Sequence, residues 1–102
     1  MAITAIDTND VRCSANRFTK RIGLKSGGRF IGQLVFESNG SVLPQDGLLA
    51  GLPNLFYHLE DFENVIDLLR NEKPVFLSFT GPGFSNENGI NTSAEPIGET
   101  EN

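Results

Sequence analysis

Residues 18–37 contain two runs in which apolar and polar positions alternate, separated by Ser26-Gly27-Gly28. Alternation with a period of two is typical of a strand with one buried face, and paired glycines are typical of a tight turn. The segment therefore predicts a β-hairpin.

The register of this hairpin depends on the length of its turn. A two-residue turn at Gly27 and Gly28 would divide the large apolar side chains between the two faces of the hairpin. A three-residue loop collects them on one face, and we therefore expect that loop, with one glycine in the left-handed region. It pairs Leu24 with Phe30, Ile22 with Gly32, and Phe18 with Phe36.

The opposite face of the predicted hairpin is part basic and part apolar. In the expected register it presents Arg21, Lys25, Arg29, Ile31 and Val35. Gly23 and Gly32 fall inside the strands, where glycine marks a bulge, a bend or a close backbone approach. Bent strands favour a small barrel over a flat sheet.

Residues 59–71 have the period of an amphipathic helix. Leu59, Phe62, Ile66 and Leu69 recur at helical spacing, and polar residues lie between them. Acidic residues at the start and basic residues at the end suit the helix dipole. Pro74 is expected to stop the helix.

The remaining elements follow from shorter patterns. Residues 54–59 favour a strand over the first turns of a helix, residues 75–80 predict a strand, and residues 90–98 a last strand limited to an edge by Pro96. Residues 38–53 predict a long connection with one turn of helix at 48–52. Residues 1–17 fit either an edge strand or a flexible lead.

The resulting order is three strands, a helix and two strands. It predicts an α+β domain over residues 18–98, followed by an acidic tail at 99–102. A small five-stranded antiparallel sheet carrying the helix fits this order, and so does an OB-like barrel.

Charge is distributed unevenly along the chain. The net charge is −5, yet six of the eight basic residues fall within residues 12–29. The sign asymmetry identifies this basic segment as a candidate binding surface. We expect a cytoplasmic protein with no membrane partner, because the sequence lacks a signal-peptide pattern and a long apolar run, and its single cysteine excludes an internal disulfide.

No residue set in the sequence resembles an active site. His58 is the only histidine and has no partner at metal-ligand spacing, and Cys13 is more typical of a small half-buried residue than of a nucleophile. We expect neither a catalytic site nor a metal or cofactor.

The basic and apolar hairpin face therefore predicts a non-enzymatic interaction domain. It would bind itself, as a homo-oligomer, or an acidic protein partner. The alternative is an OB-like nucleic-acid-binding protein that uses segment 12–29. Against that alternative, the expected register turns Phe18, Phe30 and Phe36 away from the basic face, where they could not stack on bases.

Overall fold

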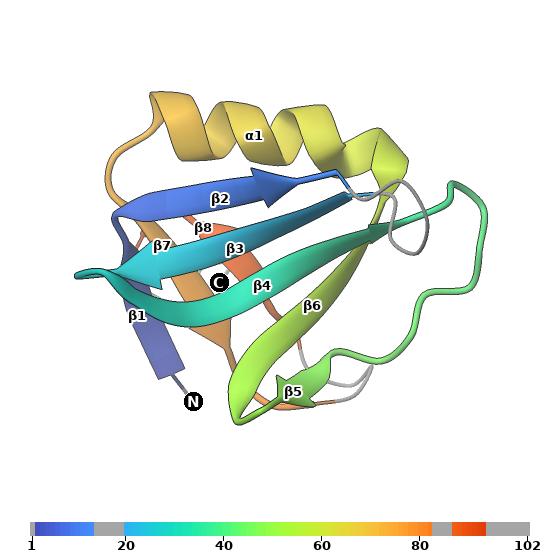
Figure 1. Ribbon diagram of the computed structural model, residues 1–102, viewed down its shortest axis with the longest axis horizontal. Helices are drawn as coiled ribbons and strands as arrows, with labels where there is room; N and C mark the ends of the chain where they lie inside the picture. The colour runs from blue at the N-terminus through green and yellow to red at the C-terminus, as the bar shows by residue number, and fades with distance from the viewer. Residues whose placement is uncertain (1, 14–19, 83–86, 94–102) are drawn as a thin grey trace, which may run out of the picture.

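The computed structural model describes residues 2–13, 20–82 and 87–93, which form two β-sheets and one α-helix (Figure 1). One sheet has the strand order β1-β7-β8, and the other has the order β2-β3-β4-β6-β5. The elements are β1 (Ala2–Ile6), β2 (Thr8–Arg12), β3 (Lys20–Ser26), β4 (Arg29–Glu37), β5 (Gly47–Leu49), β6 (Leu52–His58), a 3-10 turn (Leu59–Asp61), α1 (Phe62–Asn71), β7 (Val75–Phe79) and β8 (Gly89–Asn91).

A single core joins the two sheets and the helix. In Figure 1 the five-stranded sheet lies in front of the three-stranded sheet, and α1 runs along one side of both. The buried apolar side chains are Ile22, Leu24, Leu34, Phe36 and Leu55 from the larger sheet, Phe62, Val65 and Ile66 from α1, and Leu77 from β7. The predicted α+β class is confirmed. The described strands form two separate sheets, not one closed barrel.

The β3–β4 hairpin differs from the predicted register. Its turn has two residues, Gly27 at φ 60° and Gly28 at φ 82°, as a turn with two left-handed positions requires. Ser26 pairs with Arg29, and an irregularity follows between Leu24 and Lys25. The observed pairs include Lys25 with Phe30, Leu24 with Gly32, and Ile22 with Leu34.

The expected three-residue loop and its pairs Leu24–Phe30 and Ile22–Gly32 are therefore wrong, and Phe18 lies outside the described residues. The reason is a β-bulge. Ile31 has no partner on β3, so one extra residue on β4 changes the alternation. A two-residue turn can then coexist with one apolar face, and Ile22, Leu24 and Leu34 are all fully buried.

The larger sheet is mixed, because β4 and β6 pair in parallel. The prediction of an antiparallel sheet is wrong at this pair, although residues 54–58 do form a strand as expected. The predicted helical turn at 48–52 is also wrong. Ala50 and Gly51 have φ values of 53° and 82° and form a two-residue hairpin turn that joins β5 to β6.

The helix agrees with its sequence pattern. A 3-10 turn precedes α1, whose apolar stripe buries Phe62, Val65 and Ile66. The helix ends at Asn71, before a cis Lys73–Pro74 peptide bond. The Phe62 ring packs edge-on against Phe36, with the ring centres 5.0 Å apart.

Both segments near the N-terminus are edge strands. β1 pairs with β7, and β2 pairs with β3. Of the two interpretations of residues 1–17, the edge strand is therefore confirmed for these two segments. β7 confirms the strand expected at 75–80, and β8 confirms the start of the last strand. Residues 94–98 and the predicted acidic tail at 99–102 lie outside the described residues.

Candidate interaction surface

The five residues of the predicted interaction face do not share one surface. Val35 is only 2% exposed, so it is a core residue and cannot meet a partner in this structure. Ile31 and Arg21 are half-buried, and Arg29 is exposed. The Lys25 ammonium lies 3.1 Å from the Asp10 carboxylate and is partly neutralised. Val35 keeps its predicted place on the face opposite Leu34 and Phe36, where it lies between Arg21 and Phe56 in the sheet register, but it is buried there and not exposed.

Phe30 does not lie where the sequence pattern predicts. The pattern places it in the core, but it is 45% exposed and lies opposite Lys25. A side chain at Gly23 would come within 2.6 Å of the Phe30 ring, so this glycine gives the ring its space. A glycine inside a strand marks a bulge, a bend or a close approach, so Gly23 is the signal that the sequence offers for this position.

Exposed apolar side chains gather around Phe30. Leu49, on β5, is 58% exposed, and the half-buried Leu52 and Pro53 follow on β6. Arg29 supplies a positive charge at their margin. We call this set the Phe30 surface, defined by Arg29, Phe30, Leu49, Leu52 and Pro53.

Two hollows share the Phe30 surface. One holds about 160 Å³ and lies between Phe30 and the β5–β6 turn. The other holds about 210 Å³ and lies where β1, β4, β6 and β7 approach one another. Thr4, Ile31, Leu77 and Phe79 complete the second hollow. Both hollows are smaller than the roughly 300–1,000 Å³ of small-molecule sites, and their size suits a single apolar side chain.

No pattern in the sequence indicates the contribution of β5. Residues 38–53 contain several glycines and prolines, which predict a loop, and the apolar pair Leu48 and Leu49 was assigned to a helical turn. A three-residue strand is too short to produce a detectable alternation. Its pairing with β6 is what carries Leu49 to the Phe30 surface.

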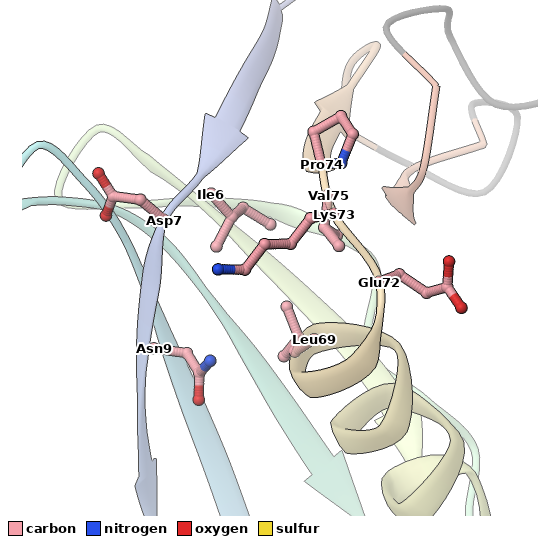
Figure 2. A pocket seen from close by; sticks show the side chains of 8 residues that line it. All are labelled: Ile6, Asp7, Asn9, Leu69, Glu72, Lys73, Pro74 and Val75. Atoms are coloured by element: carbon pink, nitrogen blue, oxygen red, sulfur yellow. The ribbon is translucent and has the colours of Figure 1, made fainter.

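A third hollow, of about 370 Å³, lies between the β1–β2 junction and the end of α1 (Figure 2). Lys73 extends across it toward β2, whereas Glu72 points away from it. The Asp7 carboxylate accepts a hydrogen bond from the Gly27 amide at 2.6 Å, so it holds the β3–β4 turn in place. The lining contains no His, Cys or Ser side chain.

The His58 side chain contacts the backbone of the connection between β4 and β5. Its Nε2 lies 2.7 Å from the Ser41 carbonyl oxygen, which fixes the connection between β4 and β5. Within residues 2–13, 20–82 and 87–93, no group of three or more His, Cys, Asp or Glu side chains is placed to hold a metal ion. Cys13 is exposed.

The connection between β4 and β5 is held by several further contacts. The Asn39 side chain accepts a hydrogen bond from the Glu60 amide at 2.7 Å, and Asp46 accepts one from the Phe56 amide at 3.0 Å. Between these anchors Val42 is 93% exposed. An apolar side chain is thus presented to solvent on an anchored segment.

Tyr57 lies on β6, next to Phe56, whose amide contacts Asp46 of this connection. Burial raises the pKa of its hydroxyl group to about 12, and the negative charges of Asp46 and then Asp61 act in the same direction. A hydrogen bond with the Ile90 backbone opposes the rise in pKa. The hydroxyl group therefore stays protonated at neutral pH. Its hydrogen bond with the Ile90 backbone connects β6 to β8.

None of the helices in the described parts of the chain has the length and apolar character needed to cross a membrane. Searches of protein-family models, curated proteins and solved structures found no match to this chain.

Proposed function

We propose that this protein is a non-enzymatic interaction domain that binds a second copy of itself, or an acidic protein segment, through the Phe30 surface. The observation that carries the proposal is the grouping of exposed Phe30 and Leu49 around two apolar hollows beside Arg29. Large apolar side chains grouped on a surface are typical of protein contacts.

The energetics support this assignment. Fully burying a large apolar side chain contributes about 1.5–3 kcal/mol, and Phe30 and Leu49, which are 45% and 58% exposed, have about half of that left to gain on binding. Arg29 makes no ion pair with any residue that the structure describes. A carboxylate on the partner can therefore approach it, which favours an acidic contact and fixes its orientation.

Phe30→Asp is expected to weaken self-association strongly. The charge would have to be desolvated within an apolar contact, and losing such an anchor costs about 2 kcal/mol or more, which is roughly thirtyfold in affinity. Sedimentation velocity over a range of protein concentrations measures the effect. The control is Val11→Asp, because Val11 is also an exposed apolar residue, at 42%, but lies on β2 at the opposite edge of the sheet. Equal association of Phe30→Asp and wild type would contradict the proposal.

A second candidate function is nucleic-acid binding by the basic hairpin. The specific observation in its favour is Phe30, which lies exposed opposite Lys25 and could stack on a base. The Lys25–Asp10 ion pair and the net charge of −5 weigh against it. Oligonucleotide titrations at about 50 and 200 mM salt separate the two functions. Salt-dependent binding that Phe30→Ala weakens would favour this candidate, and no binding at the lower salt would exclude it.

A further inference from the structure

We propose that Val42 of one copy enters the hollow beside Phe30 of another copy, so that the protein associates head to tail. This inference rests on the proposed function and names the segment that the Phe30 surface binds. Its basis is a protruding apolar side chain and an open apolar hollow on the same molecule, with opposite charges beside them.

Val42 has the properties of an inserted side chain. It is 93% exposed, more than any other large apolar side chain that the structure describes. The Ser41 carbonyl contacts His58, and the Ser41 hydroxyl donates to the Ser38 carbonyl at 2.6 Å. Because the backbone before Val42 is anchored in this way, little conformational entropy is lost when it meets a partner.

The hollow that Val42 would enter is the larger of the two beside Phe30, where β1, β4, β6 and β7 approach one another, and it has room for that side chain. Its volume is about 210 Å³ and its walls include Phe30, Leu52, Pro53 and Phe79. A dry apolar cavity of about 150 Å³ is known to accept a molecule as large as benzene. A valine side chain is smaller than benzene, so it fits without displacing the walls.

The charges beside the two features are complementary. Arg29 borders the hollow. Near Val42, the Glu60 amide contacts Asn39, and Glu37 lies next to His58 in the β4–β6 register, which brings two acidic residues to this end. Neither acid forms a salt bridge within the described residues. Insertion of Val42 thus brings acidic groups toward Arg29.

The two features lie far apart on the molecule. Figure 1 shows the β3–β4 turn, which borders the hollow through Arg29 and Phe30, and the β4–β5 connection at opposite ends of the long axis, which measures 39 Å. The contact we propose is heterologous: each copy inserts Val42 into the next copy and receives none back from it, which leaves one free hollow and one free Val42 on every pair. Association therefore continues beyond the dimer, into a ring or a chain.

A complementation experiment with two variants tests this arrangement. Val42→Asp removes the inserted side chain, and Phe30→Asp removes the hollow. Sedimentation velocity is expected to show at least tenfold weaker self-association for each variant alone. An equimolar mixture is expected to form a 1:1 heterodimer and nothing larger, because each variant retains one intact half of the contact. Arg29→Glu, which changes only an exposed charge, provides a second variant of the hollow and should also pair with Val42→Asp.

Each outcome has a distinct meaning. If Phe30→Asp is monomeric while Val42→Asp associates like wild type, the head-to-tail contact is wrong and the proposed function stands. If neither variant weakens association, both are wrong. If the mixture of the two monomeric variants stays monomeric, the contact is not heterologous and the inference falls. A wild-type chain that remains monomeric near 1 mM overturns the inference without excluding a different protein partner.

Discussion

Phe36→Ala is expected to lower the free energy of unfolding by about 3–5 kcal/mol, the range for removal of a buried aromatic ring. Phe36 is 1% exposed, and its ring lies 5.5 Å from the Tyr57 ring and 5.0 Å from the Phe62 ring. It thus connects β4, β6 and α1. Urea denaturation followed by far-UV circular dichroism measures the change.

The matched control is Phe30→Ala, which removes the same atoms from a ring that is 45% exposed. Its expected cost is below about 1.5 kcal/mol, because the partly solvated ring leaves no closed cavity. Equal destabilisation by the two substitutions would show that Phe36 is not the junction of the core. Phe36→Leu retains much of the volume and should lie between the two, which keeps the test usable if Phe36→Ala does not fold.

Gly32→Ala is expected to destabilise the protein by about 1–3 kcal/mol, the usual cost of overpacking. A Cβ atom at position 32 would lie 2.9 Å from the Pro53 carbonyl oxygen and 3.0 Å from the Leu77 Cδ2 atom. The Pro53 oxygen belongs to the backbone of β6, so it cannot move without disturbing that strand. The two sheets approach closely here only because residue 32 has no side chain.

Gly47→Ala is the control for Gly32→Ala. Nothing lies within 4 Å of a Cβ atom built at Gly47, and its φ is not in the left-handed region. Alanine should therefore leave stability unchanged or raise it by up to about 1 kcal/mol through the unfolded state. A thermal or urea midpoint that falls equally in both variants would contradict the close approach at Gly32.

The sequence predicted those elements whose patterns are long or strongly periodic. The helix has four apolar residues at helical spacing, and the hairpin and β7 alternate clearly. The register of the hairpin could not be predicted, because the bulge at Ile31 depends on which residues β4 meets across the sheet. A bulge of one residue reverses the face of everything on one side of it.

The candidate site was harder to predict than the fold. The charge pattern identifies Arg29, but the predicted register places Phe30 in the core, and that register is wrong. Leu49, Leu52 and Pro53 reach the surface through a hairpin turn at Ala50 and Gly51 and a parallel pairing with β4. Parallel pairing joins segments that are distant in sequence, so no local pattern reveals it.

Val42 illustrates a further limit of the sequence. An apolar residue in a loop is unremarkable as a pattern, and its meaning depends on the contacts that anchor its neighbours. The bond between Ser41 and His58 joins residues 17 positions apart, and the bond between Asn39 and Glu60 spans 21. Only the folded chain shows that this loop presents Val42 away from the core.

Sedimentation velocity of the wild type and Phe30→Asp, over the same concentration range and at one salt concentration, tests the central claim most directly. The account predicts that the wild-type sedimentation coefficient rises with concentration, that Phe30→Asp remains at the monomer value, and that Val11→Asp follows the wild type. Association of Phe30→Asp at wild-type strength, with its fold intact by circular dichroism, would contradict the assignment of the Phe30 surface.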